Sequence, residues 1–149
     1  MFQQGTNNYF PTLVLEVGIS QTMPQLLALR DLYLGPNTQV NVYVAIKVFS
    51  DDNGVANRWW MGVWHRNVTL GSLAPAPVNN PIVELGQLPH NLNTGKGHVL
   101  VSAPRNEQFI IPTWLLYHPM QIPPPAIPQN LVLDVEQFRL TITLNPTNR

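Results

Sequence analysis

The stretch PTLVLEVGISQTMPQLLALRDLYLGP, residues 11–36, joins an apolar strand to a helix and decides the fold class. Residues 12–18 are apolar on both faces of the expected strand, which is typical of a central strand covered on both sides. Glu16 interrupts that apolar run. Because a buried carboxylate is costly unless it is paired, hydrogen-bonded or bound to a metal, Glu16 is the first candidate for a functional residue.

The helix that follows has clear start and stop signals. Thr22 and Gln25 form a T-x-x-Q capping box, and Pro24 suits the first helical turn. Gly35 and Pro36 mark its end. The apolar residues at helical spacing are Leu26, Leu27, Leu29 and Tyr33. This pattern predicts one amphipathic helix that packs against the strand.

Two further strands complete the first half of the chain. VNVYVAIKVF, residues 40–49, alternates with apolar residues on both faces, and the strand–helix–strand order predicts a right-handed βαβ unit with parallel strands. The turn signal DDNG at 51–54 leads into residues 57–67. We expect 57–67 to pair antiparallel with the preceding strand.

The second half is rich in proline and in short strand candidates. Residues 71–96 predict mostly loop, with one short apolar piece at 82–85, whereas 98–103 and 109–117 predict short strands, the second broken at Pro112. A proline-rich connection follows at 118–130. LVLDVEQFRLTITL, residues 131–144, predicts a strand, a helical turn capped by Asp134, and a closing strand. The alternating residues of that closing strand are Leu140, Ile142 and Leu144.

Chain length limits the number of domains, and net charge limits the kinds of binding partner that we expect. The 149 residues suffice for one domain, which we divide into a βαβ-plus-hairpin core at 11–67 and a Pro-rich strand and loop portion at 68–149. The 8 Lys and Arg balance the 8 Asp and Glu. A neutral chain lacks the positive charge expected of a protein that wraps nucleic acid. Low net charge also removes one barrier to self-association, so a homo-oligomer is an expected partner.

Several residue patterns are missing from the sequence, and each absence excludes a class of chemistry. There are 0 cysteines, which excludes disulfides, thiolate nucleophiles and cysteine-ligated metals. The 4 histidines show no zinc-binding spacing. No apolar run reaches the roughly 18 residues of a membrane span, and MFQQGTNNYF lacks the features of a signal peptide. We therefore expect an intracellular protein, cytoplasmic or nuclear, with no membrane partner.

The motifs of the first half resemble those of a known family. The matching pieces are Glu16-Val17-Gly18-Ile19-Ser20, Pro24-Gln25-Leu26, Trp59-Trp60 and Leu131 to Asp134. They resemble the endonuclease branch of the PD-(D/E)XK nuclease-like superfamily, and in particular fungal proteins that share an EVGxSxxxPQL motif. The resemblance covers residues 11–67 and, faintly, 110–140. It implies a restriction-endonuclease-like α/β fold with a mixed sheet.

The resemblance also implies an active site. In that family an aspartate on one strand and a glutamate on the next hold one or two divalent metal ions, and a nearby lysine orients the attacking water. Glu16 matches the family glutamate, which makes it the implied catalytic and metal-binding residue. Lys47 and Arg30 are the basic candidates for the same catalytic site. The implied cofactor is Mg²⁺ or Mn²⁺, and the implied activity is metal-dependent hydrolysis of phosphodiesters.

The chain departs from the family at several positions. The strands that carry the family aspartate should precede residue 11, and Thr12 stands where an aspartate often follows the proline. Gly18 replaces the lysine two residues after the glutamate. Arg30 stays protonated and cannot shuttle a proton, and Lys47 is expected on a different strand. We therefore expect either a fragment or a degenerate active site.

Structural alternatives to catalysis stay open. Glu16 can instead pair with Lys47 across the sheet or with Arg30, and Lys47 can lie at a sheet edge with its ammonium group in water. Asp51 and Asp52 favour a hairpin turn over a metal site.

Aromatic and basic residues are interleaved in the hairpin. Arg58, Trp59, Trp60 and Arg66 are candidates for stacking on single-stranded nucleic acid or for contacting a protein partner. Clustered tryptophans also favour burial in a core or a subunit contact. Two functions therefore remain: a nuclease-like domain for DNA handling, and a non-catalytic interaction or self-assembly module.

Overall fold

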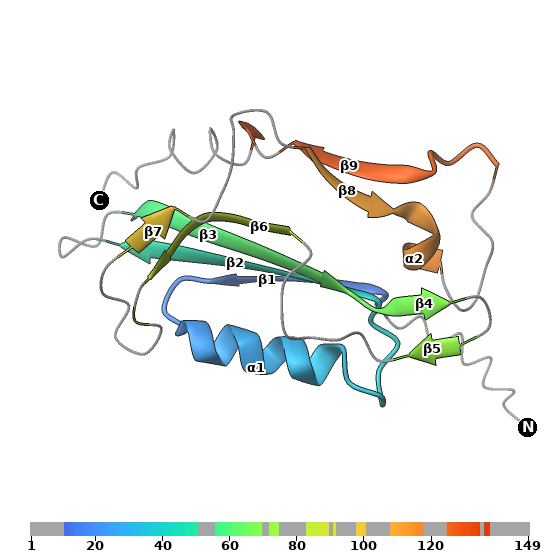
Figure 1. Cartoon of the computed structure of the whole chain (residues 1–149), viewed down its shortest axis with the longest axis horizontal. Coiled ribbons are helices and arrows are strands. Elements are labelled where there is room, and N and C mark those ends of the chain that lie inside the picture. Colours follow the sequence, from blue (N-terminus) through green and yellow to red (C-terminus); the bar gives the residue numbers. More distant parts are fainter. Residues whose placement is uncertain are drawn as a thin grey trace, which may run out of the picture.

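A five-stranded mixed sheet forms the centre of the molecule (Figure 1). The computed structural model describes residues 11–50, 56–69, 72–74, 83–89, 91, 98–100, 108–117, 125–134 and 136–137. The strands of the sheet, in spatial order, are β1 (Leu13–Gly18), β2 (Val42–Ser50), β3 (Ala56–His65), β6 (Val83–Pro89) and β7 (His98–Leu100). The expected mixed α/β class is confirmed.

The first strand and helix form as their sequence predicts. α1 (Met23–Tyr33) connects the parallel strands β1 and β2. Thr22 Oγ1 accepts a hydrogen bond from the Gln25 N–H at 3.4 Å, and Gln25 Oε1 accepts one from the Thr22 N–H at 2.7 Å. These two bonds complete the capping box. Leu26 of α1 is fully buried.

The alternation of β2 and β3 builds two cores on opposite faces of the sheet. β3 pairs antiparallel with β2, as expected. The core on the α1 face includes Tyr43, Ala45, Phe49, Trp60 and Trp64. The core on the other face includes Val42, Val44, Ile46, Met61 and Val63. The predicted alternation of residues 40–49 is confirmed.

The position of β1 in the sheet differs from the prediction. β1 is an end strand and pairs with β2 alone among the described strands, so the expectation of a central strand covered on both sides is wrong. Leu15 is 49% exposed and Val17 is 51% exposed. Apolar residues on both faces of a strand do not show whether a neighbouring layer covers each face, because the covering layer is a property of the tertiary structure.

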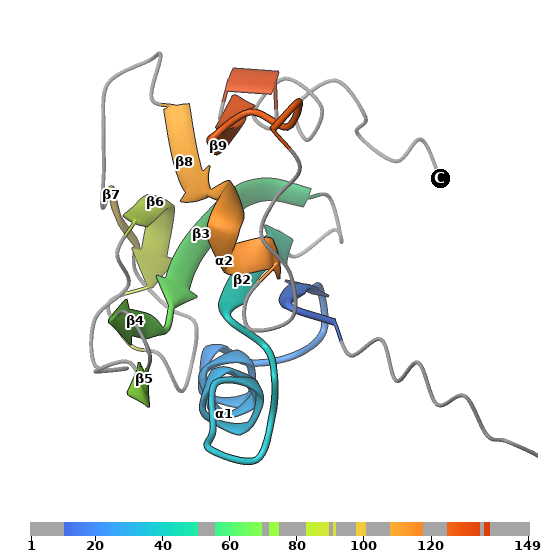
Figure 2. The same cartoon turned by 90° about the vertical axis from the view of Figure 1, so that its right-hand side faces the viewer.

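A second unit covers the face of the sheet opposite α1, so that the molecule has three layers (Figure 2). The elements of this unit are β8 (Gln108–Pro112), α2 (Thr113–Tyr117) and β9 (Asn130–Asp134). Ile111 and Leu115 join the core beneath it. Two hydrogen bonds fasten α2 to the sheet: Thr12 Oγ1 donates to Leu116 O at 2.6 Å, and Asn41 Nδ2 donates to Leu115 O at 2.8 Å.

Two described parts of the second half form elements that were not expected. The region 71–96 includes two described strands: β5 (Ser72–Ala74) pairs with β4 (Asn67–Thr69), and β6, which contains most of the apolar piece predicted at 82–85, joins the main sheet beside β3. Gly86 lies within β6 and has a φ of 92°. Because it has no side chain, the main chain of β6 approaches the main chain of Trp59 in β3 closely. The predicted break of 109–117 at Pro112 is confirmed, but the residues after it form the helix α2 instead of a strand.

The end of the described chain is a turn after β9. Asp134 Oδ1 accepts hydrogen bonds from the Glu136 N–H at 2.8 Å and the Gln137 N–H at 3.4 Å, which confirms the predicted cap. The predicted turn at 51–54 and the closing strand after Gln137 lie outside the described residues. Neither helix in the described part of the chain has the length and apolar character needed to cross a membrane.

Candidate functional site

Glu16 lies half-buried between β1 and α1. Its Oε1 accepts a hydrogen bond from the Tyr33 hydroxyl group at 3.3 Å. Neither Lys47 nor Arg30 forms an ion pair with Glu16; in the described part of the chain the ion pair is Arg30 to Asp31, at 2.6 Å. The expectation that Glu16 pairs with one of these two cations is therefore wrong. The hydroxyl group of a helix residue, which sequence reasoning missed, is its partner.

Lys47 lies next to Gly18 in the parallel register of β1 and β2. Because paired residues of neighbouring strands share a face, Lys47 and Glu16 lie on the same side of the sheet, one register step of two residues apart. Lys47 is 8% exposed, so the expectation of a solvated lysine at a sheet edge is wrong. Its ammonium group donates to the carbonyl oxygen of Ile19, and burial lowers the pKa of Lys47.

Gly18 is closely covered by the side chains of Leu26 and Gln21. A Cβ at this position would lie 2.9 Å from Leu26 Cδ1 and 3.1 Å from Gln21 Oε1. A lysine two residues after Glu16 would therefore require the side chains of Leu26 and Gln21 to shift, and the cation that lies next to this position is Lys47 of β2. Lys47 lies on β2, within the predicted strand 40–49, but its position beside Gly18 was not predicted because the register of β1 against β2 was unknown.

Arg30 contacts other groups than Glu16. Its guanidinium lies 5.4 Å from the centroid of the Trp64 ring and donates to Asp31 Oδ1 at 2.6 and 2.8 Å. Trp64 continues a line of rings through Tyr43 to Tyr33, with centroids 5.9 and 5.8 Å apart. Arg30 therefore stabilises the aromatic core under α1, and no contact brings it to a catalytic position beside Glu16.

The aromatic and basic strip of the hairpin is mostly interior. Trp60 is 1% exposed and its Nε1 donates to Glu84 Oε1 at 2.8 Å. Arg66 is 3% exposed; its Nε donates to Val40 O at 2.6 Å, and its guanidinium also bonds the loop that follows α1. Trp59 packs against the core of the opposite face. Trp60 and Arg66 thus do not reach nucleic acid or a partner at the surface.

Arg58 is the remaining member of the strip. It is half-buried, and its Nε is a buried donor without a hydrogen-bond partner among the described residues. The structure therefore does not bring Arg58 together with Trp60 and Arg66 on one exposed surface.

The carboxylates near Glu16 do not assemble a metal centre. Among the described residues no group of three or more His, Asp or Glu side chains lies close enough to hold a metal ion. Glu84 shares the α1 face with Glu16, but Ala45 and Gly62 lie between them in the sheet. Mg²⁺ requires an octahedral oxygen shell. The donor set of the described residues does not fit that ion. Asp51 and Asp52 lie outside the described residues.

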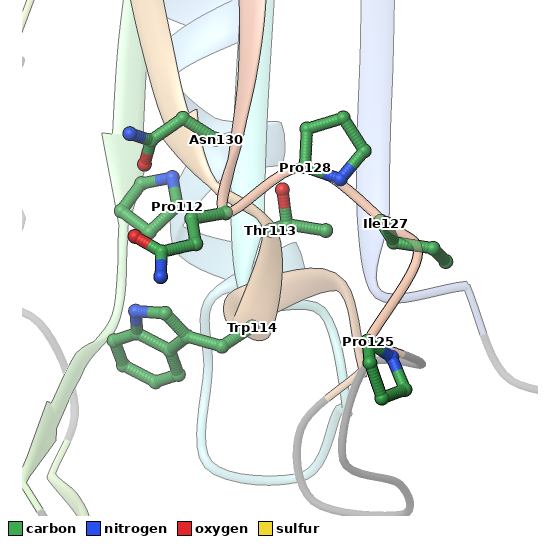
Figure 3. A pocket seen from close by; sticks show the side chains of 8 residues that line it. Pro112, Thr113, Trp114, Pro125, Ile127, Pro128 and Asn130 are labelled. Carbon is green, nitrogen blue, oxygen red and sulfur yellow. The ribbon is translucent and has the colours of Figure 1, made fainter.

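A pocket of about 590 Å³ opens beside α2 and was not expected from the sequence (Figure 3). Apolar rings and two amides line it: Pro112, Trp114, Pro125, Pro128, Gln129 and Asn130. Thr113 N donates to Gln129 O at 2.9 Å, which holds the two walls together. No titratable side chain lines this pocket, so the pocket does not supply a general acid or base.

The open side of β1 is the second feature that sequence reasoning missed. Leu15, Val17 and Ile19 are 49%, 51% and 67% exposed and lie along one edge of the sheet. Unpaired edge strands with apolar side chains are sites at which another strand adds. The signal in the sequence was the apolar strand itself, but only the sheet order shows on which side no described strand pairs with it.

Comparisons with protein-family models, with curated proteins and with solved structures gave no match for this chain. The function is therefore inferred from the geometry of Glu16, Lys47 and the open edge of β1.

Proposed function

We propose that this chain is a nuclease-like α/β domain that acts as a non-catalytic interaction module. The open edge of β1 carries the proposal, because half-exposed Leu15 and Val17 lie on a strand whose outer edge no described strand pairs. Strand addition at such an edge binds a partner through main-chain hydrogen bonds, and alternate side chains give specificity.

The state of the candidate catalytic residues supports this proposal. Glu16 accepts a hydrogen bond from Tyr33, and the Lys47 ammonium group donates to the Ile19 carbonyl. A catalytic lysine must be within hydrogen-bond reach of the reacting group or of one bridging water. In this chain a main-chain oxygen holds the ammonium group, and no cluster of acidic side chains among the described residues completes a metal site.

Metal-dependent hydrolysis of phosphodiesters is the second candidate, and one observation favours it. Lys47 lies next to Gly18, the position at which the resembling family carries its lysine, and it shares a face with Glu16. This arrangement keeps an acid and a base together on neighbouring strands. The activity would require a further acidic ligand from outside the described residues.

A cleavage assay separates the two candidates. Single- and double-stranded DNA and RNA are incubated with Mg²⁺ or Mn²⁺ and with the wild type, Glu16→Gln or Glu84→Gln. Glu84→Gln is the matched control, because Glu84 is also half-buried and bonded to an aromatic side chain on the same face. We expect that the wild type shows no metal-dependent cleavage that requires Glu16. Any cleavage should therefore be equal in the wild type and in Glu16→Gln. Cleavage lost in Glu16→Gln and retained in Glu84→Gln would overturn the proposal and establish the second candidate.

Light scattering tests the interaction role directly. An assembly module gives a defined oligomer whose mass does not change when EDTA removes divalent metal. A monomer at all accessible concentrations, or an oligomer that dissociates in EDTA, contradicts assembly through the β1 edge.

A further inference from the structure

The outer edge of β1 lacks lysine, proline and a β-bulge, which are three of the features that prevent strand pairing. Natural edge strands are protected by lysine, proline or bulges. The sequence of β1, LVLEVG, contains no lysine or proline, and its register with β2 is continuous from Leu13 to Gly18. No described strand pairs with this edge, so the main chain of another segment can add there.

The two faces of β1 specify what kind of strand fits beside it. Leu15 and Val17 are half-exposed on the face opposite α1, so a partner strand needs apolar side chains on that face. Glu16 lies on the α1 face, where Tyr33 is its hydrogen-bond partner and no described cation pairs with it. The same partner strand therefore needs a cation on its other face.

This chain itself contains a segment with that pattern. FRLTITL, residues 138–144, places Phe138 and Leu140 on one face and Arg139 on the other when it is extended. The segment lies outside the described residues. Its alternation matches β1 in charge and in apolar character.

We infer that residues 138–144 of a second copy of this chain add to the outer edge of β1. The inference rests on the proposed interaction role and names its partner. In an antiparallel register with Arg139 opposite Glu16, Leu140 lies opposite Leu15 and Phe138 lies opposite Val17. A slip by one residue would turn the apolar side chains to the α1 face. This antiparallel register therefore satisfies both faces of β1.

The segment comes from another copy because of where the described chain ends. The register requires Gln137 to lie opposite Gly18. Asp134 holds Gln137 in the turn after β9, and both views place that turn beyond β8 and β9, away from β1 (Figures 1 and 2). The same chain thus does not bring its own residue 138 to Val17, whereas a second copy is free of this constraint.

Pairing of β1 with β1 of a second copy fits the edge less well. That arrangement brings a second Glu16 to the interface and supplies no cation. Residues 138–144 supply Arg139, and opposite charges on neighbouring strands stabilise pairing, whereas like charges destabilise it. The chain has a net charge of zero, so no overall repulsion opposes association of two copies.

Disulfide cross-linking tests the inference on a clean background, because the chain contains 0 cysteines. Val17→Cys and Phe138→Cys are purified separately, mixed and oxidised. We expect a covalent dimer between the two variants. Leu32→Cys, whose side chain is 64% exposed on α1, replaces Val17→Cys as the matched control and should give little cross-linking with Phe138→Cys.

Each other cross-linking result overturns the inference. Rapid dimerisation of Val17→Cys with itself indicates pairing of β1 with β1. A monomeric disulfide in the double variant Val17→Cys/Phe138→Cys indicates pairing within one chain. Equal cross-linking of Val17→Cys and Leu32→Cys to Phe138→Cys indicates random collision.

A charge exchange tests the register without cysteines. Arg139→Glu should weaken association about tenfold, because a charge-assisted contact becomes a repulsion. Combining it with Glu16→Lys should restore association. If Arg139→Glu has no effect on the oligomer, or if Glu16→Lys does not rescue it, the register is wrong. These outcomes do not depend on the cleavage assay, so the failure of this inference is distinguishable from that of the proposed function.

Discussion

Tyr33 donates a hydrogen bond to Glu16 Oε1 at 3.3 Å and thereby connects the last turn of α1 to the middle of β1. The carboxylate raises the pKa of the Tyr33 hydroxyl group by electrostatic repulsion of the phenolate, and burial acts in the same direction. In the folded state Tyr33 is therefore protonated, and its neutral hydroxyl group donates the hydrogen bond to Glu16.

Stability should fall in alkali because of two tyrosines. Burial raises the pKa of Tyr43, with Glu16 as the second cause, and Tyr33 is shifted the same way. Above about pH 10 the unfolded chain loses these protons while the folded chain keeps them, so the free energy of unfolding decreases as the pH rises. Urea unfolding at several pH values measures this. A flat profile above pH 10 would contradict it.

Tyr43→Phe should reduce that alkaline loss. The Tyr43 hydroxyl group donates to Leu26 O at 2.9 Å, so the variant should also lose about 1 kcal/mol at neutral pH. The measurement compares urea unfolding of wild type and variant at neutral and alkaline pH. If Tyr43→Phe loses as much stability at alkaline pH as the wild type, the alkaline loss comes from titrating groups other than Tyr43.

Gly18→Ala should destabilise the fold by about 1–3 kcal/mol, because the new methyl group meets Leu26 at 2.9 Å and overpacks the α1 contact. Gly86→Ala is the comparison variant and should cost more. Its φ is 92°, and its Cβ would lie 2.3 Å from the main-chain oxygen of Trp59, which has no rotamer with which to move away. Chemical denaturation ranks the two variants, and the reverse order would refute this explanation.

Lys47→Met should leave the free energy of unfolding at neutral pH unchanged or raise it by about 1 kcal/mol, because it removes a buried charge. Burial lowers the pKa of Lys47, so just below its usual value the unfolded chain binds more protons than the folded chain, and wild-type stability rises with pH there. The variant should lack that rise. Urea unfolding between neutral pH and about pH 10 checks it. A large loss of stability would show that the bond to the Ile19 carbonyl dominates.

Arg66→Met should cost about 3–5 kcal/mol, since it leaves Val40 O and other loop carbonyl oxygens without their charged donor. Arg66→Lys should recover only part of this, because an ammonium group does not reproduce the planar guanidinium. Asp31→Asn, which removes an exposed ion pair, should cost less than about 1 kcal/mol. Thermal or urea unfolding compares the three variants. A small effect of Arg66→Met on the free energy of unfolding would show that these hydrogen bonds do not stabilise the fold.

The candidate site was predictable in its members but not in its contacts. Glu16 stands out in the sequence as a carboxylate in an apolar strand, and this identified the interface of β1 and α1. The contact with Tyr33 depends on how far α1 runs antiparallel along β1, and the position of Lys47 beside Gly18 depends on the strand register. Neither quantity is encoded in local spacing.

By itself the sequence determined the elements of the first half. The capping box at Thr22, the stop at Gly35 and the alternation of β2 are local signals, and local backbone chemistry acts before any tertiary contact forms. Tertiary structure decided that β1 ends the sheet and that Arg66 is buried. It also decided that the Gly- and Pro-rich region supplies β6. Those outcomes depend on which strand or loop lies alongside each residue. These neighbours are determined by strand pairing and burial between segments that are far apart in the sequence.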